Sequence, residues 1–265
     1  MSGERTPIPL LAEEDSVLTR SVAALGRFPR DASWVLIGGI AVFLRLGSVT
    51  RVTADADTIA RSQALLLDRL AADPTTIISG GNVQMSIADH TVDIDVTDVA
   101  DEPLPDDIDR RPFALARRSA LATATAERVV VTHPSTAAVL ADAVIPVATT
   151  GALVALKAVS IVRRPHSTHP EKVGSDIHDM VRLVAGNGAT SVAGEVLALE
   201  PELAAWVADY VDRAFGSPDL RYTLLRLRRY DRSPGAEALS DGDVAATAIL
   251  ADAIRDGIDP GEGRL

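Results

Sequence analysis

A change of sequence character near Pro134 constrains the fold of this chain more than any other feature. Before it, short apolar runs with strand-like alternation are separated by turns that contain glycine or proline. After it, stretches rich in alanine and leucine follow one another with helical periodicity. We therefore expect an α/β (α+β) protein, with a mixed-sheet N-terminal lobe over residues 1–140 and an all-helical C-terminal lobe over residues 141–265.

Local patterns divide both lobes into elements. In the N-terminal lobe, the Gly38-Gly39 turn separates an apolar strand from a short helix that reaches Leu46. The other helices expected there cover residues 11–27 and 61–72, and strands are expected over 34–37, 52–59, 75–78, 83–87, 91–96 and 128–131. The stretch 101–112 is acidic and contains three prolines, which indicates an exposed loop. In the C-terminal lobe, helices are expected near 149–163, 175–186, 189–198, 201–214, 217–229 and 242–256.

The segment 52–59 carries two carboxylates in a setting suited to chemistry. Period-two alternation places Thr53, Asp55 and Asp57 on one face of the predicted strand. A later predicted strand carries Asp93 and Asp95, which also face the same way. Acidic oxygens in such a group are the ligands that Mg²⁺ or Mn²⁺ prefers, so we predict a metal site formed by Asp55, Asp57 and a third carboxylate.

The third carboxylate is either Asp93 or Asp95. Asp93 is preferred because Val92 and Ile94 flank it near the centre of the strand. Acidic side chains at a strand end are also common as simple solvated charges, and that alternative applies to each of these residues.

The Gly38-Gly39 turn lies where a predicted strand meets a helix. Glycines there let backbone N–H groups approach phosphate oxygens, and the helix dipole favours the negative charge. Thr53 and Arg51 are further candidates for phosphate contacts, although a strand threonine or a strand-end arginine needs no such role. Together with the acids, this order of elements suits transfer of phosphoryl or nucleotidyl groups.

Composition restricts the alternatives. There is no cysteine, which removes disulfides and thiolate metal sites. The net charge is −11, so any binding of nucleic acid requires a local basic patch. We expect no membrane span and a cytoplasmic location.

Lysine is rare enough here to be informative, since only Lys157 and Lys172 occur among 26 basic residues. Lys157 lies in an apolar predicted helix, where its ammonium either contacts nucleotide phosphates or extends to solvent. Asp176 and Asp179 share one face of the next helix, and Asp179 is a candidate to orient Lys157. Asp176 also has a plain explanation as an acid at a helix start.

These motifs resemble the AbiEii/MenT family of nucleotidyltransferase toxins, within the DNA polymerase β-like nucleotidyltransferase superfamily. The resemblance rests on the glycine turn, the R-x-T-x-D-x-D strand and the lysine and aspartate helices, and Ser175 departs from it where the family often has a lysine. It implies a catalytic lobe over 1–140 and a helical lobe over 141–265 that completes the cleft for nucleotide and acceptor. The residues that the resemblance implies are catalytic Asp55, Asp57, Lys157 and Asp179, and nucleotide-binding Gly38, Gly39, Arg51, Thr53 and Lys157. The predicted metal ligands are Asp55, Asp57 and, from its place in the strand, Asp93.

The resemblance also predicts an activity and partners. The activity is transfer of a nucleoside monophosphate from an NTP to an acceptor, here a tRNA 3′ end, by the toxin of a toxin–antitoxin or phage-defence pair with a separate antitoxin protein. An arginine cluster in the C-terminal half is a candidate tRNA contact or a counter-charge for acidic helices; its members are Arg221, Arg226, Arg228, Arg229 and Arg232. Two alternatives stay open: transfer to a cationic small molecule such as an aminoglycoside, which the acidic charge would suit, and a catalytically silent nucleotide-binding module.

Overall fold

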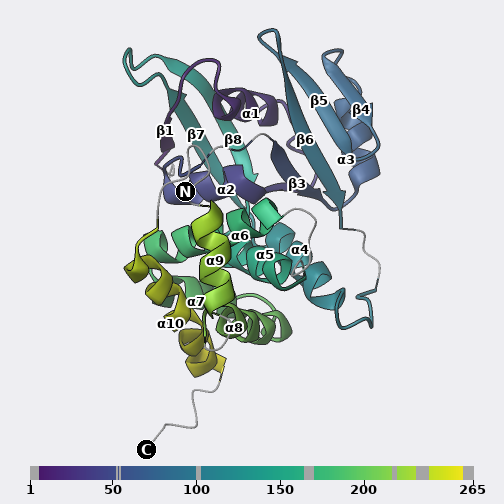
Figure 1. The fold of residues 1–265 in the computed structure, drawn as a ribbon. Helices are drawn as coiled ribbons and strands as arrows, with labels where there is room; N and C mark the ends of the chain where they lie inside the picture. The colour runs from purple at the N-terminus through teal and green to yellow at the C-terminus, as the bar shows by residue number, and fades with distance from the viewer. Residues whose placement is uncertain are drawn as a thin grey trace, which may run out of the picture. The chain divides into compact units, whose positions relative to one another are not determined.

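A computed structural model describes residues 6–51, 53, 55–99, 103–163, 170–216, 220–230 and 239–258. The chain divides into two units. The sheet unit comprises Met1–Glu102 and Ala120–Ala148, and the helical unit comprises Pro103–Ser119 and Thr149–Leu265. The mixed α/β fold class is confirmed, because one unit is built on a sheet and the described part of the other is helical (Figure 1).

The sheet unit is built on an eight-stranded sheet in the order β1-β7-β8-β2-β3-β6-β5-β4. Three neighbouring pairs are parallel, β1–β7, β8–β2 and β3–β6, and the others are antiparallel. The strands are β1 (Ile8–Leu11), β2 (Trp34–Ile37), β3 (Ala56–Ala60), β4 (Thr76–Ser79), β5 (Asn82–Ile87), β6 (His90–Asp98), β7 (Thr125–Thr132) and β8 (Val139–Val147).

The β4–β5–β6 meander is antiparallel, as predicted. Two tight turns connect its strands, with Gly80 at φ 59° in one and Asp89 at φ 65° in the other. Alternation then decides which side chains are buried. Val92, Ile94 and Val96 of β6 pack into the core, so the intervening acids lie on the opposite face of the sheet.

Three elements of the structure were not predicted. The segment Ile8–Leu11 is a strand paired with β7 and not the start of a helix; the helix α1 covers only Val17–Leu25. The segment Val139–Val147 forms β8 although its alanines favour a helix, because β7 pairs with it along its length. The end of the predicted loop is the start of α4 (Arg111–Ala122).

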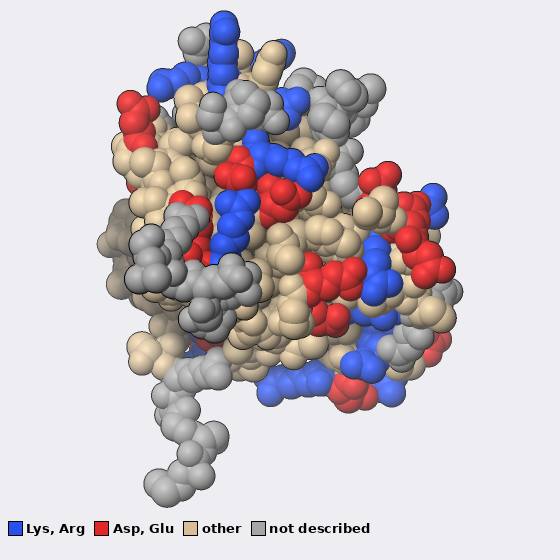
Figure 2. Space-filling view, turned by 90° about the horizontal axis from the view of Figure 1, so that it is seen from below, with Lys and Arg blue, Asp and Glu red and all other residues tan. Residues whose placement is uncertain are grey.

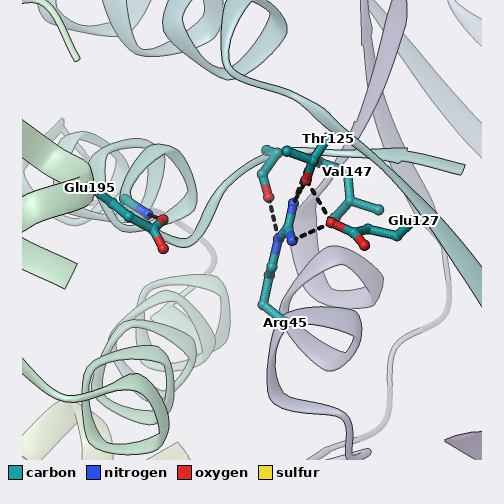
Figure 3. Close-up of polar contacts among 7 residues, drawn as sticks. Arg45, Thr125, Glu127, Val147 and Glu195 are labelled. Atoms are coloured by element: carbon teal, nitrogen blue, oxygen red, sulfur yellow. Dashed lines mark hydrogen bonds and ion pairs between the residues drawn. The ribbon is translucent and has the colours of Figure 1, made fainter. Parts of the chain in front are cut away.

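Helix α2 (Gly38–Leu46) is fixed at its C-terminal end by Arg45 (Figure 3). The guanidinium donates to the backbone carbonyls of Val147 and Ala148 at 2.8 and 2.7 Å, and to Thr125 Oγ1. It also pairs with the buried Glu127 at 2.9 Å. The planar fork of arginine satisfies several acceptors at once, so α2 has a defined register on β7 and β8.

Among the described residues, the helical unit contains helices and connecting loops and no strand. The predicted helices are present, and α3 (Gln63–Leu70) of the sheet unit also matches its prediction. Besides most of α4, the described part of the helical unit contains α5 (Thr150–Arg163), α6 (Pro170–Asn187), α7 (Ala189–Leu197), α8 (Pro201–Phe215), α9 (Leu220–Tyr230) and α10 (Asp241–Ile258).

An ion pair on the surface joins two helices of the helical unit. Arg111 of α4 donates to both oxygens of Glu202 at the start of α8, at 2.7 and 2.9 Å. This pairing holds the pKa of the Glu202 carboxyl below its usual value. In the part of the chain that is described, no helix combines the length and apolar character needed to cross a membrane.

Candidate functional site

Three carboxylates gather where β3 and β6 run side by side. Asp55, Asp57 and Asp95 each offer an oxygen, and these oxygens lie within 4.8 Å of one another. Asp57 and Asp95 are direct partners in the parallel register of β3 and β6, so their side chains share one face. Asp55 lies one residue before β3. Three carboxylate oxygens at this spacing form a donor set that fits a hard divalent cation.

The register corrects the preference for Asp93 as the third carboxylate. Asp93 accepts a hydrogen bond from Gln84 Nε2 at 2.8 Å, across the β5–β6 pair. Asp95 stands beside Asp57 and accepts from Asn82 Nδ2 at 3.0 Å. Both acids face the same way along β6, so only the alignment of β6 against β3 distinguishes them. Metal binding itself stays a prediction.

The segment that carries the acid pair is less regular than predicted. The strand was expected over 52–59, whereas β3 begins at Ala56. Val52 and Ala54 lie outside the described residues. Thr53 and Asp55 precede the strand, and Thr53 Oγ1 lies 3.5 Å from the Asp55 carbonyl oxygen. The carboxylates converge even so, because Asp55 and Asp57 meet Asp95 on the neighbouring strand.

Gly38 lies directly against the acidic cluster. Its neighbour Ile37 is the register partner of Asp57 in the antiparallel β2–β3 pair. Gly38 has φ +70°, and a Cβ at this position would lie 2.9 Å from Asp57 Cγ. A side chain is therefore excluded twice, by the backbone conformation and by the Asp57 carboxylate.

Gly39 lies against the two other predicted phosphate contacts. A Cβ there would lie 3.0 Å from the Arg51 guanidinium carbon and 3.1 Å from Thr53 Oγ1. The same guanidinium lies 5.8 Å from the ring centroid of Phe43 in α2. The N-cap residue of α2, Ile37, makes no side-chain hydrogen bond to the helix. A positive side chain, backbone donors and the positive end of a helix dipole thus meet beside three acids.

The helical unit holds a second charged group. Lys157 Nζ lies 2.7 Å from Asp176 Oδ1 and 2.8 Å from Asp179 Oδ2, and all three residues are buried. The contact between Lys157 and Asp179 agrees with the predicted orienting role. The simple explanation of Asp176 as a helix start is wrong, since α6 begins at Pro170. Contact of Lys157 with a triphosphate stays a prediction.

His178 was not predicted as part of this group. It is fully buried, with Nδ1 3.9 Å from Asp179 Oδ1 and its ring centroid 5.5 Å from that of Tyr230. The only sequence signal is its place between two acids of the α6 motif.

No protein-family model and no curated protein matches this chain. Two solved structures resemble it. An antigenic nucleotidyltransferase-like protein from Paracoccidioides brasiliensis is 19% identical with a TM-score of 0.46, over 79% of this chain and 92% of that one. A protein from H. pylori described as a candidate nucleotidyltransferase is 12% identical with a TM-score of 0.48, over 93% and 96%. Likeness at this level assigns no activity.

Proposed function

We propose that this protein is a metal-dependent nucleotidyltransferase, which transfers a nucleoside monophosphate from an NTP to an acceptor and releases pyrophosphate. The observation that carries the proposal is the convergence of Asp55, Asp57 and Asp95 within 4.8 Å, directly against the Gly38-Gly39 turn. Carboxylates alone would suit many cation sites. Carboxylates beside a glycine turn at a helix start suit a cation that is bound together with a phosphate chain.

Each side chain has a task in this reaction. Asp55, Asp57 and Asp95 would hold Mg²⁺ or Mn²⁺, and Asn82 orients Asp95 through its 3.0 Å hydrogen bond. A bound divalent cation neutralises triphosphate charge and lowers the pKa of an attacking hydroxyl. The backbone N–H groups that follow Gly38 donate to phosphate oxygens at the start of α2, and Arg51 adds a positive charge next to them.

The reaction follows from these positions. The acceptor hydroxyl attacks the α-phosphorus of the NTP, its proton passes to water or to a carboxylate, and the bond to the bridging oxygen breaks. Pyrophosphate leaves with the electron pair of that bond. Because the transferred group is highly charged, placement and charge neutralisation supply most of the rate.

The acceptor and the biological role rest on the motif resemblance. It favours the 3′ end of a tRNA as acceptor, Lys157 as a contact to the triphosphate, and the role of a toxin held in check by an antitoxin protein. One observation favours a second candidate: the net charge of −11 would attract a cationic small molecule, such as an aminoglycoside, more readily than RNA. A third candidate function is that of a catalytically silent nucleotide-binding module.

Labelled-nucleotide transfer tests the proposal. Purified protein is incubated with Mg²⁺ or Mn²⁺, each α-³²P-labelled NTP in turn, and total tRNA. The control variants are Asp55→Asn and Asp57→Asn, which keep the shape of the side chains and remove their charge. We expect labelled tRNA and pyrophosphate from the wild type and neither product from the variants.

The other outcomes separate the candidates. Label on an aminoglycoside but not on tRNA would replace the acceptor and keep the enzyme class. NTP binding without transfer to any acceptor, and without loss of pyrophosphate, would leave the silent module.

A further inference from the structure

Helix α9 is the most basic element of an acidic chain. Its eleven residues, LRYTLLRLRRY, contain four arginines and no acidic residue. The chain as a whole carries 37 acidic and 26 basic residues. Figure 2 shows acidic and basic side chains set among one another on the face it presents.

Three of the four arginines of α9 fall on an outward stripe, and the fourth, Arg226, is half-buried. Five exposed residues at helical spacing form the stripe, and we call them the α9 stripe: Arg221, Tyr222, Leu225, Arg228 and Arg229. Tyr222 is 65% exposed and Leu225 is 58% exposed. An aromatic and an aliphatic side chain thus lie between positive charges on open surface.

The opposite side of α9 is firmly packed. Thr223 and Leu227 are buried, and Thr223 Oγ1 donates to the Ala214 carbonyl of α8. A Cβ added at Gly174 of α6 would come within 2.7 Å of Tyr230 Cβ, so these two helices approach closely. The stripe is therefore presented by a fixed helix, and its side chains are not needed for packing.

The charge of the stripe is available to a ligand. No described residue forms an ion pair with Arg221 or Arg229. Arg228 pairs with Asp241 at 3.2 Å, but both side chains are largely exposed, at 65% and 94%. A pair in water contributes little and exchanges readily for a stronger anion.

We propose that the α9 stripe binds single-stranded RNA, with its arginines on phosphates and Tyr222 stacked on a base. This inference rests on the proposed function in one respect, that the acceptor is RNA. Arg221 and Arg229 are eight residues apart, or about 12 Å along the helix. At about 3.4 Å per stacked nucleotide, that distance spans roughly three to four nucleotides.

The aromatic residue is the reason to favour RNA over an acidic protein partner. Unpaired bases stack on exposed aromatic side chains while the backbone follows a positive surface, which is how single strands are commonly bound. An acidic protein surface would use the arginines and leave Tyr222 without a matching group.

The test measures binding and needs no turnover. The probe is a 5′-fluorescein single-stranded RNA of about 12 nucleotides, within the usual site sizes for single strands. It is titrated with the Asp55→Asn/Asp57→Asn protein without NTP, at several salt concentrations. The test variant is Arg221→Gln/Arg229→Gln. The charge-matched control is Arg110→Gln/Arg213→Gln, which removes two exposed arginines elsewhere in the helical unit.

The magnitudes follow from counterion release. Each phosphate contact contributes about 0.7 to the slope of log Kd against log salt, so loss of two contacts lowers that slope by roughly 1.4. At about 0.1 M salt this corresponds to a Kd about 25-fold weaker. Tyr222→Ala should weaken binding by about fivefold or more, and Tyr222→Phe should retain it, because stacking needs only the ring. The control double variant should bind like its parent.

Three results would overturn the inference: equal losses in the stripe and control variants, equal binding of RNA and poly-glutamate, or no binding of RNA by the parent protein at low salt. Binding of RNA through the stripe without nucleotide transfer in the labelling assay would support the stripe as an RNA-binding surface and refute the proposed nucleotidyltransferase activity. If the stripe variant binds RNA normally and nucleotide is transferred to tRNA, the proposed enzyme is supported and the stripe proposal is overturned.

Discussion

Replacement of Gly38 by alanine is the sharpest single perturbation of the acidic site. The added methyl carbon would lie 2.0 Å from Asp57 Oδ2 and 3.0 Å from Asp57 Cβ. Contacts under about 3 Å do not persist between such atoms, so the carboxylate must move by roughly 1 Å. The residue would also have to keep φ near +70°, in the left-handed region.

These two effects have different magnitudes and different readouts. The left-handed conformation costs an L residue about 1–2 kcal/mol of stability. Displacement of a metal-binding carboxylate by about 1 Å should lower kcat/KM by about 100-fold or more. Cation affinity should fall as well, because one of three ligands leaves its position.

Gly47 provides a matched control at the other end of the same helix. Its φ is +65°, and nothing lies within 4 Å of the position that a Cβ would take. Gly47→Ala therefore carries the backbone cost without the collision. Both variants are compared by urea unfolding, by Mn²⁺ titration and by transfer of labelled nucleotide. We expect similar stabilities, with weak Mn²⁺ binding and low transfer in Gly38→Ala alone.

Equal behaviour of the two glycine variants would refute this reasoning. If Gly38→Ala bound Mn²⁺ and transferred nucleotide like Gly47→Ala, then the Asp57 carboxylate would not need its present position. The acidic cluster and the glycine turn would then not act as one site, and the proposed function would be refuted.

Other predictions address the remaining charged groups. Asp95→Asn should weaken Mn²⁺ binding about tenfold or more while Asp93→Asn changes it little, as calorimetric titration would measure; the reverse order would restore Asp93 as the third ligand. Lys157→Met leaves two buried carboxylates without their ammonium and should cost about 3–5 kcal/mol in urea unfolding, whereas a loss below about 1 kcal/mol would show that the pair is not needed for stability. Ser240 and Asp243 form a reciprocal cap at the start of α10, so Ser240→Ala should cost about 1 kcal/mol by thermal unfolding. The backbone N–H of Ser240 lowers the pKa of Asp243 from its ordinary value of 3.8, so its stabilisation is present above that pH and is lost as the pH falls below it. Asp243→Asn should remove this part of the acid dependence, and an unchanged pH profile would exclude the cap as its source.

The missed elements show where local patterns stop being sufficient. Val139–Val147 contains two alanines whose helix propensity is high, yet it is a strand because β7 pairs with it from Thr125 to Thr132. Ile8–Leu11 is a strand because the same β7 pairs with it on its other edge, more than a hundred residues away in sequence. Propensity is a weak preference, and long-range pairing overrides it.

Much of this protein was determined by the sequence alone. Periodicity placed most helices and strands, because burial of one face imposes a spacing on apolar residues wherever an element lies in the chain. Gly38-Gly39 and the acid pair Asp55 and Asp57 were also identified from order and spacing. Tertiary structure decided the rest. The register of β3 against β6 brings Asp95 to Asp57, although Asp93 faces the same way. The packing of α5 on α6 turns Lys157 and Asp179 into a buried ion pair. Such choices depend on how distant segments align, and no local pattern of residues encodes that alignment.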